Sequence, residues 1–201
     1  GDAKILTRIY NISDGCNNNN VTVEHVITVE DNQAPTITCP ANITQTADAG
    51  LCGADITITN PTATDNCSTS FTFTGTRDDG QALDTTYPVG TTTITWTATD
   101  DANNVSSSCQ QTVTITDDEL PNVICQNITV QLNSSGNATI SENDIDNGST
   151  DNCVIDTIAL DITTFDCSNI GDNTVTLTVT DVNGNSNTCT ATVTITDGSE
   201  N

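Results

Sequence analysis

The sequence predicts an all-β protein, built from tandem immunoglobulin-like β-sandwich modules in an extended array. Apolar and threonine residues alternate in many short segments, as they do in half-buried β-strands. Turns rich in Asp, Asn, Gly and Pro separate these segments, and no segment has a sustained helical period. Four landmarks also recur 86 residues later: Asp31, Pro35, Cys39 and Cys67 return as Asp117, Pro121, Cys125 and Cys153. A shared offset of this size indicates tandem copies of one small domain.

Alternation places the individual strands. The expected strands lie around residues 21–29, 56–58, 71–73, 94–98, 113–115, 130–132, 158–162, 175–179 and 193–195. Trp96 and Leu177 occupy matching positions on two of them, and both are expected in a core. Several short strands with regular turns in about 85 residues are typical of an immunoglobulin-like sandwich.

Module boundaries are expected where a strand ends in acidic residues followed by proline. This rule gives one module at 31–116, a second and divergent module at 117–196, and the start of a further linker at 197–201. Residues 1–30 match only the end of a module, because 5–14 parallels 94–100 and 27–29 parallels 113–115. Two strands do not form a sandwich alone. Residues 1–30 are therefore interpreted as the C-terminal part of a preceding immunoglobulin-like module.

Charge and cysteine content restrict the function. Three basic residues stand against 27 acidic ones, which gives a net charge of −24. Nucleic acid and anionic membrane surfaces both require clustered Lys and Arg, so neither is an expected partner. No apolar run approaches the ~20 residues that span a bilayer, so no membrane insertion is expected. Nine cysteines in short β-rich modules indicate disulfides and hence an extracellular, secreted location.

Acidic loops suggest a cation site in each module. In a seven-strand sandwich, the entering linker and two loops share one pole, and these pieces carry most of the carboxylates. The candidate metal ligands are Glu30, Asp31, Asp65, Asp100, Asp101 and Asn103 in the first module, and Asp117, Asp118, Glu119, Asp151, Asp181 and Asn183 in the second. Ca²⁺ takes six to eight oxygen ligands of these types, so Ca²⁺ is the expected cofactor. The alternative is that Asp and Asn simply form solvated turns.

Catalysis is not expected. The chain has one histidine, His25, on an alternating strand row, so a Ser-His-Asp or Cys-His site could not recur in each module. Carboxylates are too abundant to single out a glycosidase pair. Cysteine spacing lacks the C-x₂-C pairs of zinc sites.

The cysteines form two sets of four. Cys39, Cys67 and Cys109 match Cys125, Cys153 and Cys189, whereas the fourth member is Cys52 in one module and Cys167 in the other. Four cysteines allow three connectivities, and the sequence alone does not choose among them. Cys16 remains as an odd cysteine.

Three stretches resemble the hyalin repeat (HYR) domain: 38–44 (TCPANIT), 61–67 (PTATDNC) and 87–100 (YPVGTTTITWTATD). Residues 31–116 match the pattern well, and 117–196 resemble a divergent relative that is similar to modules of very long secreted surface proteins of bacteria. The resemblance implies an immunoglobulin-like fold, a role in extracellular adhesion and no catalytic residues.

The resemblance also implies a disulfide pattern. Simpler hyalin-type repeats have only the first and last cysteine, which implies Cys39–Cys109 and Cys125–Cys189. The remaining pairs would be Cys52–Cys67 and Cys153–Cys167, with no bridge between modules. Strand order, however, places Cys52 nearer the opposite pole from Cys67.

The expected function is a structural and adhesive repeat region of a long extracellular surface protein or filament, acting as a stiff spacer. Its expected partners are neighbouring modules, other copies in a filament, and surface glycans or proteins. The alternative is an accessory or carbohydrate-binding region of a secreted multidomain enzyme. Thr85 and Thr157 are candidate O-glycan acceptors, because Asp-Thr-Thr at 84–86 and Asp-Thr-Ile at 156–158 resemble an acceptor pattern of one bacterial group.

Overall fold

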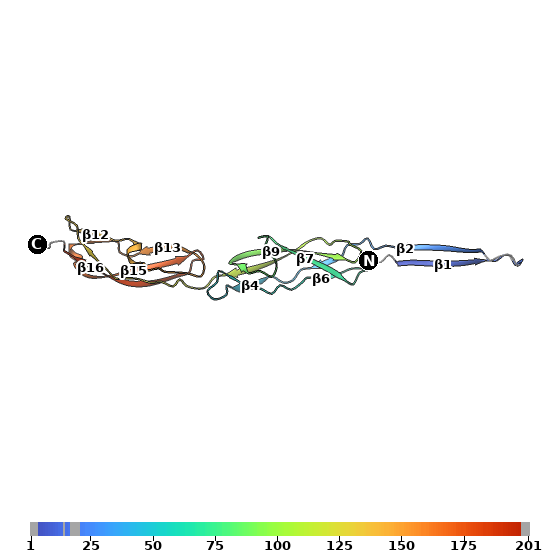
Figure 1. The fold of residues 1–201 in the computed structure, drawn as a ribbon, viewed down its shortest axis with the longest axis horizontal. Coiled ribbons are helices and arrows are strands. Elements are labelled where there is room, and N and C mark those ends of the chain that lie inside the picture. Colours follow the sequence, from blue (N-terminus) through green and yellow to red (C-terminus); the bar gives the residue numbers. More distant parts are fainter. Residues whose placement is uncertain (1–3, 14, 17–20, 198–201) are drawn as a thin grey trace. The chain divides into compact units, whose positions relative to one another are not determined.

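The computed structural model describes residues 4–13, 15–16 and 21–197 (Figure 1). The chain divides into two compact units. The first unit comprises Gly1–Ile43, Ile56–Thr85 and Thr92–Val113, and the second comprises Thr44–Asp55, Thr86–Thr91 and Thr114–Asn201. Of the linker expected at 197–201, Asp197 is described and the other four residues lie outside the described part; residues 1–3, 14 and 17–20 of the expected partial module do so as well.

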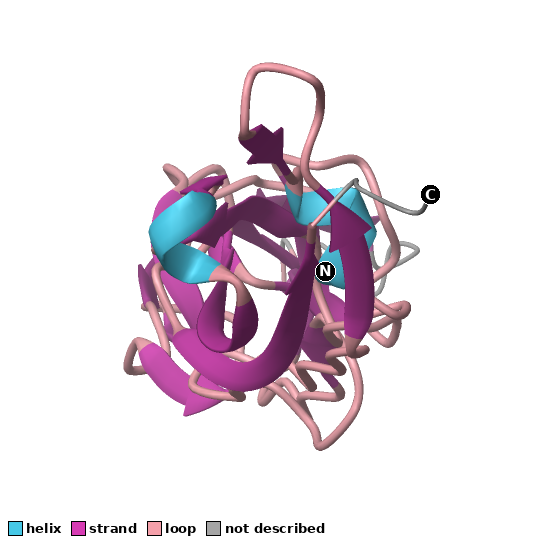
Figure 2. Cartoon of the chain, turned by 90° about the vertical axis from the view of Figure 1, so that its left-hand side faces the viewer, coloured by secondary structure: helices cyan, strands magenta, loops and turns pink. Residues whose placement is uncertain are grey.

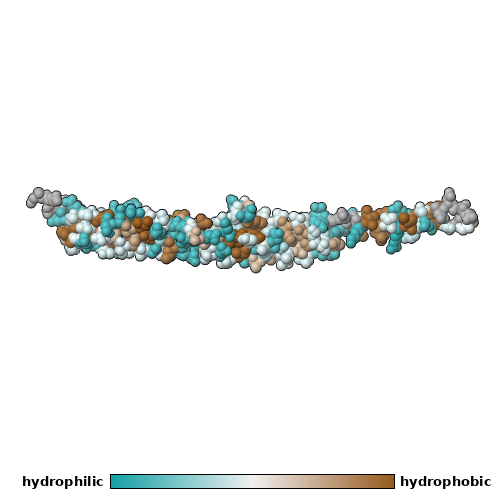
Figure 3. All heavy atoms as spheres, turned by 60° about the horizontal axis from the view of Figure 1, so that its bottom comes forward, coloured by the Kyte–Doolittle hydropathy of each residue, from teal (hydrophilic) through white to brown (hydrophobic). Residues whose placement is uncertain are grey.

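The first unit begins with an antiparallel hairpin. Strand β1 (Lys4–Ile12) pairs with β2 (Val21–Val29) over its full length, from Lys4 opposite Val29 to Ile12 opposite Val21. Every residue of both strands is exposed, and apolar side chains are visible on the hairpin surface at the right of Figure 3. Leu6, Tyr10 and Ile27 are between 36% and 50% exposed. The alternation that predicts a buried face therefore occurs here on two strands whose residues are all exposed in the described structure.

Eight further strands follow the hairpin. They are β3 (Thr36–Thr38), β4 (Ile43–Thr46), β5 (Gly53–Ala54), β6 (Thr62–Thr64), β7 (Phe71–Arg77), β8 (Tyr87–Pro88), β9 (Gly90–Asp100) and β10 (Cys109–Thr116). Four of them form a sheet in the order β4-β10-β9-β7, and β3-β6 and β5-β8 form short antiparallel pairs. Along β9 and β10 alternate residues are buried, including Ile94, Trp96, Ala98 and Val113. Their period of two places the apolar row of each strand on the core face.

Trp96 is the largest buried side chain of the first unit, 1% exposed. Its indole Nε1 donates to Oε1 of the fully buried Gln111 at 3.2 Å, and Gln111 Nε2 donates to the carbonyl of Ala41 at 2.8 Å. Across the sheet, Gly75 pairs with Trp96, and a Cβ on Gly75 would lie 2.7 Å from the indole ring. These two hydrogen bonds form a polar chain through the core. Together with the glycine that faces the indole ring, they accommodate the single tryptophan.

The second unit repeats this arrangement. Its remaining strands are β11 (Ile128–Gln131), β12 (Asn137–Thr139), β13 (Ile155–Leu160), β14 (Thr164–Asp166), β15 (Gly171–Asp181) and β16 (Ser186–Thr196). The main sheet has the order β11-β16-β15-β13, in which β11 is parallel to β16. Its buried row includes Val175, Leu177, Val179, Val193 and Ile195. Leu177 is buried as expected, at the position that matches Trp96.

The structure confirms the all-β prediction, with two small exceptions. Helix α1 (Glu142–Ile145) and the 3-10 turn η1 (Cys167–Asn169) are the cyan segments in Figure 2. Both begin with a capping box, in which Ser141 and Asp144, or Asp166 and Asn169, bond each other reciprocally. One turn is too short for a helical period to appear in the sequence. Within the described part of the chain, no helix has the length and apolar character needed to cross a membrane.

Residues 56–58 do not form the expected strand. Ile56 and Ile58 are half-buried and their neighbours are exposed, so the alternation is real, but the segment belongs to no strand of the structure. A period of two reports which side of an extended segment is buried. It does not report whether a neighbouring backbone is in register to form a ladder.

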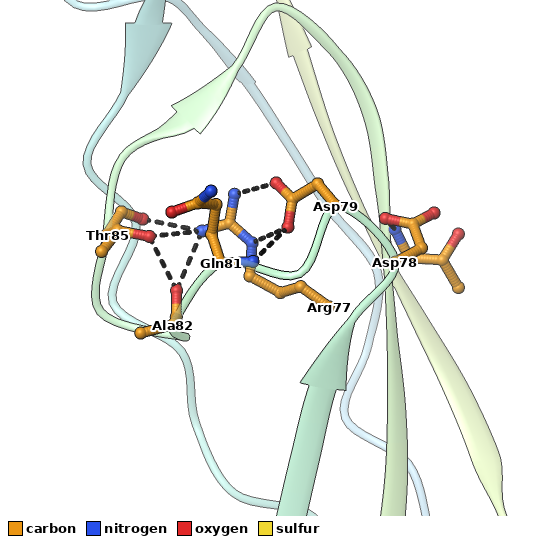
Figure 4. Close-up of polar contacts among 7 residues, drawn as sticks. Arg77, Asp78, Asp79, Gln81, Ala82 and Thr85 are labelled. Atoms are coloured by element: carbon orange, nitrogen blue, oxygen red, sulfur yellow. Dashed lines mark hydrogen bonds and ion pairs between the residues drawn. The ribbon is translucent and has the colours of Figure 1, made fainter.

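Arg77, one of the three basic residues, is at the end of β7 with its side chain fully buried (Figure 4). Its guanidinium forms an ion pair with Asp79 and donates to the carbonyls of Ala82 and Thr85 at 3.0 Å. The guanidinium hydrogen bond, more than any other contact, holds the pKa of Asp79 below its ordinary value. Arg77 therefore shapes the 78–85 loop by saturating its carbonyls.

The buried amide of Gln111 gives the first prediction. Gln111→Leu should destabilise folding by about 1–3 kcal/mol, because the Trp96 N–H and the Ala41 carbonyl would lose their partner. Gln110→Leu is the matched control, since its side chain faces solvent on the same strand. Urea unfolding followed by tryptophan fluorescence would measure both, and equal midpoints for the two variants would contradict the proposed polar chain.

Candidate cation site

Three chain segments bring carboxylates together in the first unit. Asp31 follows β2, Asp65 follows β6, and Asp100 ends β9. One oxygen from each lies within 4.8 Å of the others. Asp31 Oδ2 accepts from the Ser68 hydroxyl at 3.2 Å, and Asp65 Oδ2 accepts from the backbone N–H groups of Cys67 and Ser68 at 2.9 and 3.1 Å. The linker and the two loops therefore meet at one pole, as the sequence predicts.

The second unit repeats the cluster around Asp117 and Asp151. Their oxygens and the sulfur of Cys153 lie within 4.8 Å of one another. Asp117 accepts from the side-chain amides of Asn152 at 3.1 Å and Asn183 at 2.9 Å. The sulfur of Cys153 is committed to a disulfide, so this cluster offers oxygen ligands and no thiolate. Oxygen ligands of this kind suit a hard cation.

Asp100 and Asp181 anchor the two clusters by the same hydrogen bonds. Asp100 accepts from the backbone and side-chain amides of Asn104 at 2.7 and 2.9 Å, and Asp181 accepts from those of Asn185, both at 2.8 Å. Each Asn side chain also donates to the backbone carbonyl of the linker aspartate, Asp31 or Asp117. Burial raises the pKa of Asp100 and of Asp181, but the hydrogen bonds outweigh it, and both pKa values lie below the ordinary range.

Three oxygen atoms in the clusters are buried and accept no hydrogen bond within the described part of the chain. They are Oδ1 of Asp65, Oδ1 of Asp151 and Oδ1 of Asn152. A buried acceptor without a donor costs about 1–3 kcal/mol, more for a charged group, and native proteins rarely leave one unpaired. Because Asp65 and Asp151 are related by the repeat, the same unpaired oxygen occurs twice. These atoms fit a bound cation.

The other predicted ligands lie around these clusters. Neither group of converging ligands among the described residues includes Glu30, Asp101, Asp118 or Glu119, and all four are exposed. Glu119 accepts instead from the backbone N–H of Gly50 at 2.8 Å. Asn103 has φ 67° and forms a turn, whereas Asn183 donates to Asp117. The candidate set thus contains both carboxylates that converge and residues that form exposed turns.

Asn104 is a site residue that sequence analysis missed. It fixes Asp100 and the linker carbonyl of Asp31 at once. A signal for it exists: an Asn follows the strand-ending Asp by four residues in both repeats, as Asn104 after Asp100 and Asn185 after Asp181. The same donor set at both positions makes this spacing recognisable.

Three disulfides connect the described cysteines, and two of them are the pairs that the resemblance implies. Cys39 bonds Cys109 and Cys125 bonds Cys189. The expected pairs Cys52–Cys67 and Cys153–Cys167 do not form: Cys52 bonds Cys153, and Cys67 and Cys167 are exposed thiols. This bridge links the first sequence repeat to the second, contrary to expectation. The physical reason is position, because Cys52 and Cys153 both lie in the second compact unit, whereas Cys67 lies in the first.

The two candidate glycan acceptors differ in their surroundings. Thr157 is exposed on β13. The hydroxyl of Thr85 donates to the carbonyl of Ala82 at 2.8 Å and accepts from Arg77 at 3.0 Å. O-glycosylation at either position stays a prediction.

Comparison with known proteins points to one family. The HYR domain family matches residues 30–115. Hyalin of Strongylocentrotus purpuratus is 33% identical over 110 residues, which are 55% of this chain and 9% of that protein. Hyalin of Lytechinus variegatus is 28% identical over 122 residues, 60% of this chain and 22% of that protein. The chain spans less than a quarter of the length of either relative.

Comparison with solved structures gives weak matches to cadherin extracellular regions. A human mucin-like protocadherin EC1-2 structure gives a TM-score of 0.40 at 10% identity, covering 83% of this chain and all of that one. Drosophila N-cadherin EC1-4 gives 0.42 at 14% identity, covering 96% of this chain and 57% of that one. These scores are too low to support a functional inference.

The Asp181 network predicts a pH-dependent stability. In Asp181→Asn, an amide N–H would face the donor group of Asn185, so folding should lose about 1–3 kcal/mol at pH 7. A lowered pKa in the folded state gives stability that is present above the ordinary Asp pKa of about 3.9 and is lost as pH falls through the lowered value. The difference in unfolding free energy between wild type and variant should therefore become smaller below about pH 4.

Asp156→Asn, on an exposed position of β13, is the control for this experiment. Thermal unfolding in chelator at pH 7 and at pH 3 would give the stabilities of the wild type and of both variants. A stability difference between wild type and Asp181→Asn that does not depend on pH would contradict the assigned role of the Asp181 carboxylate.

Proposed function

Because residues 30–115 match the HYR domain family, we propose that this chain is a non-catalytic, adhesive and structural region of a long extracellular surface protein or filament, acting as a stiff spacer that disulfides and Ca²⁺ stabilise. The observation that supports it best is the duplicated carboxylate cluster, with Asp65 and Asp151 each carrying one buried, unpaired oxygen. Three disulfides agree with an extracellular location.

Calcium is the proposed cofactor of both clusters. Asp31, Asp65 and Asp100 would hold it in the first unit, and Asp117, Asp151 and the Asn152 carbonyl oxygen in the second. A bound cation would neutralise converging carboxylates and satisfy the unpaired oxygens. Nearby side chains are Asn and Ser donors, and no Lys or Arg competes for these carboxylates within the hydrogen bonds described for them.

A structural role agrees with the chemistry of the site. His25 is exposed on β2 opposite Arg8, and it belongs to neither group of converging ligands among the described residues. Asp100 and Asp181 have low pKa values, so they are unsuited to act as general acids near neutral pH. We propose that the carboxylates order the backbone instead of transferring protons.

The proposed partners are those of a repeat array. Neighbouring modules of the same chain come first, and other copies in a filament or surface glycans and proteins come second; nucleic acid and membrane insertion are not proposed. We also propose the boundaries 31–116 and 117–196 for the two modules and assign residues 1–30 to the end of a preceding one. The hairpin β1-β2 supports this assignment, because it pairs as β15 and β16 do and leaves its apolar residues exposed.

Calcium should raise the melting temperature of the chain, because a ligand that binds only the folded state stabilises it by mass action. Asp151→Asn keeps the side-chain shape and removes one charge, so it should weaken this response and leave stability in chelator unchanged or higher. Asp156→Asn should respond like the wild type, since Asp156 lies outside the clusters. Differential scanning calorimetry with and without Ca²⁺ would decide, and identical melting in Ca²⁺ and chelator would refute the cofactor assignment.

The stiff-spacer role predicts a defined particle in solution. Small-angle scattering of the full chain should give an elongated envelope, and the double variant Cys52→Ser/Cys153→Ser should give a broader distribution of dimensions. That bridge closes a separation of 101 residues, so its loss should also reduce stability by about 4–5 kcal/mol in the chain-entropy account. A compact, globular envelope for the wild type is incompatible with the proposal.

A further inference from the structure

The Cys52–Cys153 disulfide belongs to a larger contact between the two sequence repeats. Asn152 Nδ2 donates to the carbonyl of Leu51 at 3.0 Å, and the N–H of Gly50 donates to Glu119 Oε2 at 2.8 Å. The loop at 47–52 after β4 is thus bound to the second repeat by one covalent bond and one hydrogen bond at the 151–153 turn and by one hydrogen bond at Glu119. Both ends of this contact lie in the second compact unit.

Cys67 is the counterpart of Cys153 in the first repeat. Each cysteine follows an Asp-Asn pair, and each backbone N–H donates to the aspartate Oδ2 at 2.9 Å. In both repeats the other oxygen of that aspartate is buried and unpaired. The two turns are therefore the same structure, but Cys153 is in a disulfide and Cys67 is an exposed thiol. Cys67 lines a pocket of about 490 Å³ together with Lys4 and Val29, at the base of the hairpin.

The second repeat carries a thiol where the first repeat carries Cys52. In the β5-β8 pair, the buried Ala54 lies opposite the buried Tyr87, and in β12-β14 the buried Ala138 lies opposite the buried Phe165. This match aligns the strand pairs. The last residue of the loop before β5 is Cys52, and the last residue of the loop before β12 is Gly136.

Cys167 lies directly across from that glycine. Its sulfur is 3.7 Å from the Gly136 carbonyl oxygen, and a Cβ built on Gly136 would be only 2.8 Å from the same sulfur. The Cys167 thiol therefore occupies the space into which a side chain at the Cys52-equivalent position would project. The cysteine thus precedes the first strand of the pair in the first repeat and follows the second strand of the pair in the second repeat. Its sulfur nevertheless occupies the same place in the fold.

We propose that an inter-module disulfide repeats along the array and that Cys52–Cys153 is one such bond. Cys67 is its incoming half, which bonds the preceding module, and Cys167 is its outgoing half, which bonds the following module. Cys167 would bond the Cys153-type cysteine of an adjoining module of this repeat type, and Cys67 would bond a Cys52-type or Cys167-type cysteine. The inference rests on the repeat array of the proposed function. It is independent of calcium.

The bond forms by oxidation of two thiols. A disulfide oxidant such as oxidised glutathione supplies the two-electron acceptor: one cysteine thiolate displaces glutathione to give a mixed disulfide, and the second thiolate attacks its protein sulfur. The two S–H bonds are lost as two protons, one protein S–S bond forms, and the oxidant leaves as two glutathione thiols. The closed bridge in the second unit requires the same chemistry.

An extended chain would test the outgoing half. Residues 1–196 would be followed directly by a second copy of residues 117–201, so that Thr196 precedes Asp117 as Thr116 does. After refolding in glutathione buffer with chelator, free thiols would be alkylated and unreduced peptides mapped by mass spectrometry. We expect Cys167 to be bonded to the appended copy of Cys153 in most molecules. The matched variant Cys167→Ser should leave that copy alkylated.

The appended module reports its own folding through its copy of the Cys125–Cys189 bond. If this bond forms and Cys167 is nevertheless alkylated, the proposal is wrong. If the appended module does not fold, the unextended chain decides: in Cys52→Ser/Val89→Cys the cysteine moves across the strand pair to the position that Cys167 occupies in the second repeat. A bond from residue 89 to Cys153 supports the proposal, and alkylated Cys153 in this variant overturns it.

Discussion

The shortage of basic side chains to pair with its many carboxylates is the constraint on which this structure depends. Twenty-seven acidic residues share three basic ones, and the side chain of Arg77 is already saturated by its own loop. Three basic side chains cannot balance this many carboxylates, and the described carboxylates of the acidic poles accept from Asn amides and backbone N–H groups. Asp100 and Asp181 are 5% and 2% exposed, and each accepts two hydrogen bonds from one Asn four residues later. These bonds close the loops after β9 and β15 and fix the linker carbonyl beside them.

Alternation predicted the strands because it is a direct consequence of burial on one face. Trp96 and Leu177 were identified as core residues on that basis, and both are buried. The same signal could not show that the described residues of the hairpin are exposed on both faces, because period two is a property of the strand and not of its neighbour. It also could not reveal the buried Gln111, whose polar side chain is needed only because the matching core residue is a tryptophan with an N–H to satisfy.

The convergence of acidic loops followed from strand order, but the disulfide partners did not. Aligning the repeats by sequence offset equates Cys67 with Cys153 and gives Cys52 and Cys167 no counterparts. The equivalence becomes visible only across a strand pair, where Gly136 and Cys167 lie side by side. Positions that are neighbours through a ladder are far apart in sequence, so an offset rule does not detect an exchange between them. Sequence alone could not separate the converging carboxylates from turn residues either, since both are Asp or Asn.

The two stabilising devices of the second unit meet at one residue. Cys153 is joined to Cys52, and its sulfur lies within 4.8 Å of oxygens of Asp117 and Asp151. Reduction of a disulfide begins with attack by a thiolate, which is an anion, and ends with a thiolate leaving. Neighbouring carboxylates oppose both events, because they repel the attacking anion and disfavour negative charge on the departing sulfur. Carboxylates this close to Cys153 should therefore disfavour reduction of the Cys52–Cys153 bridge.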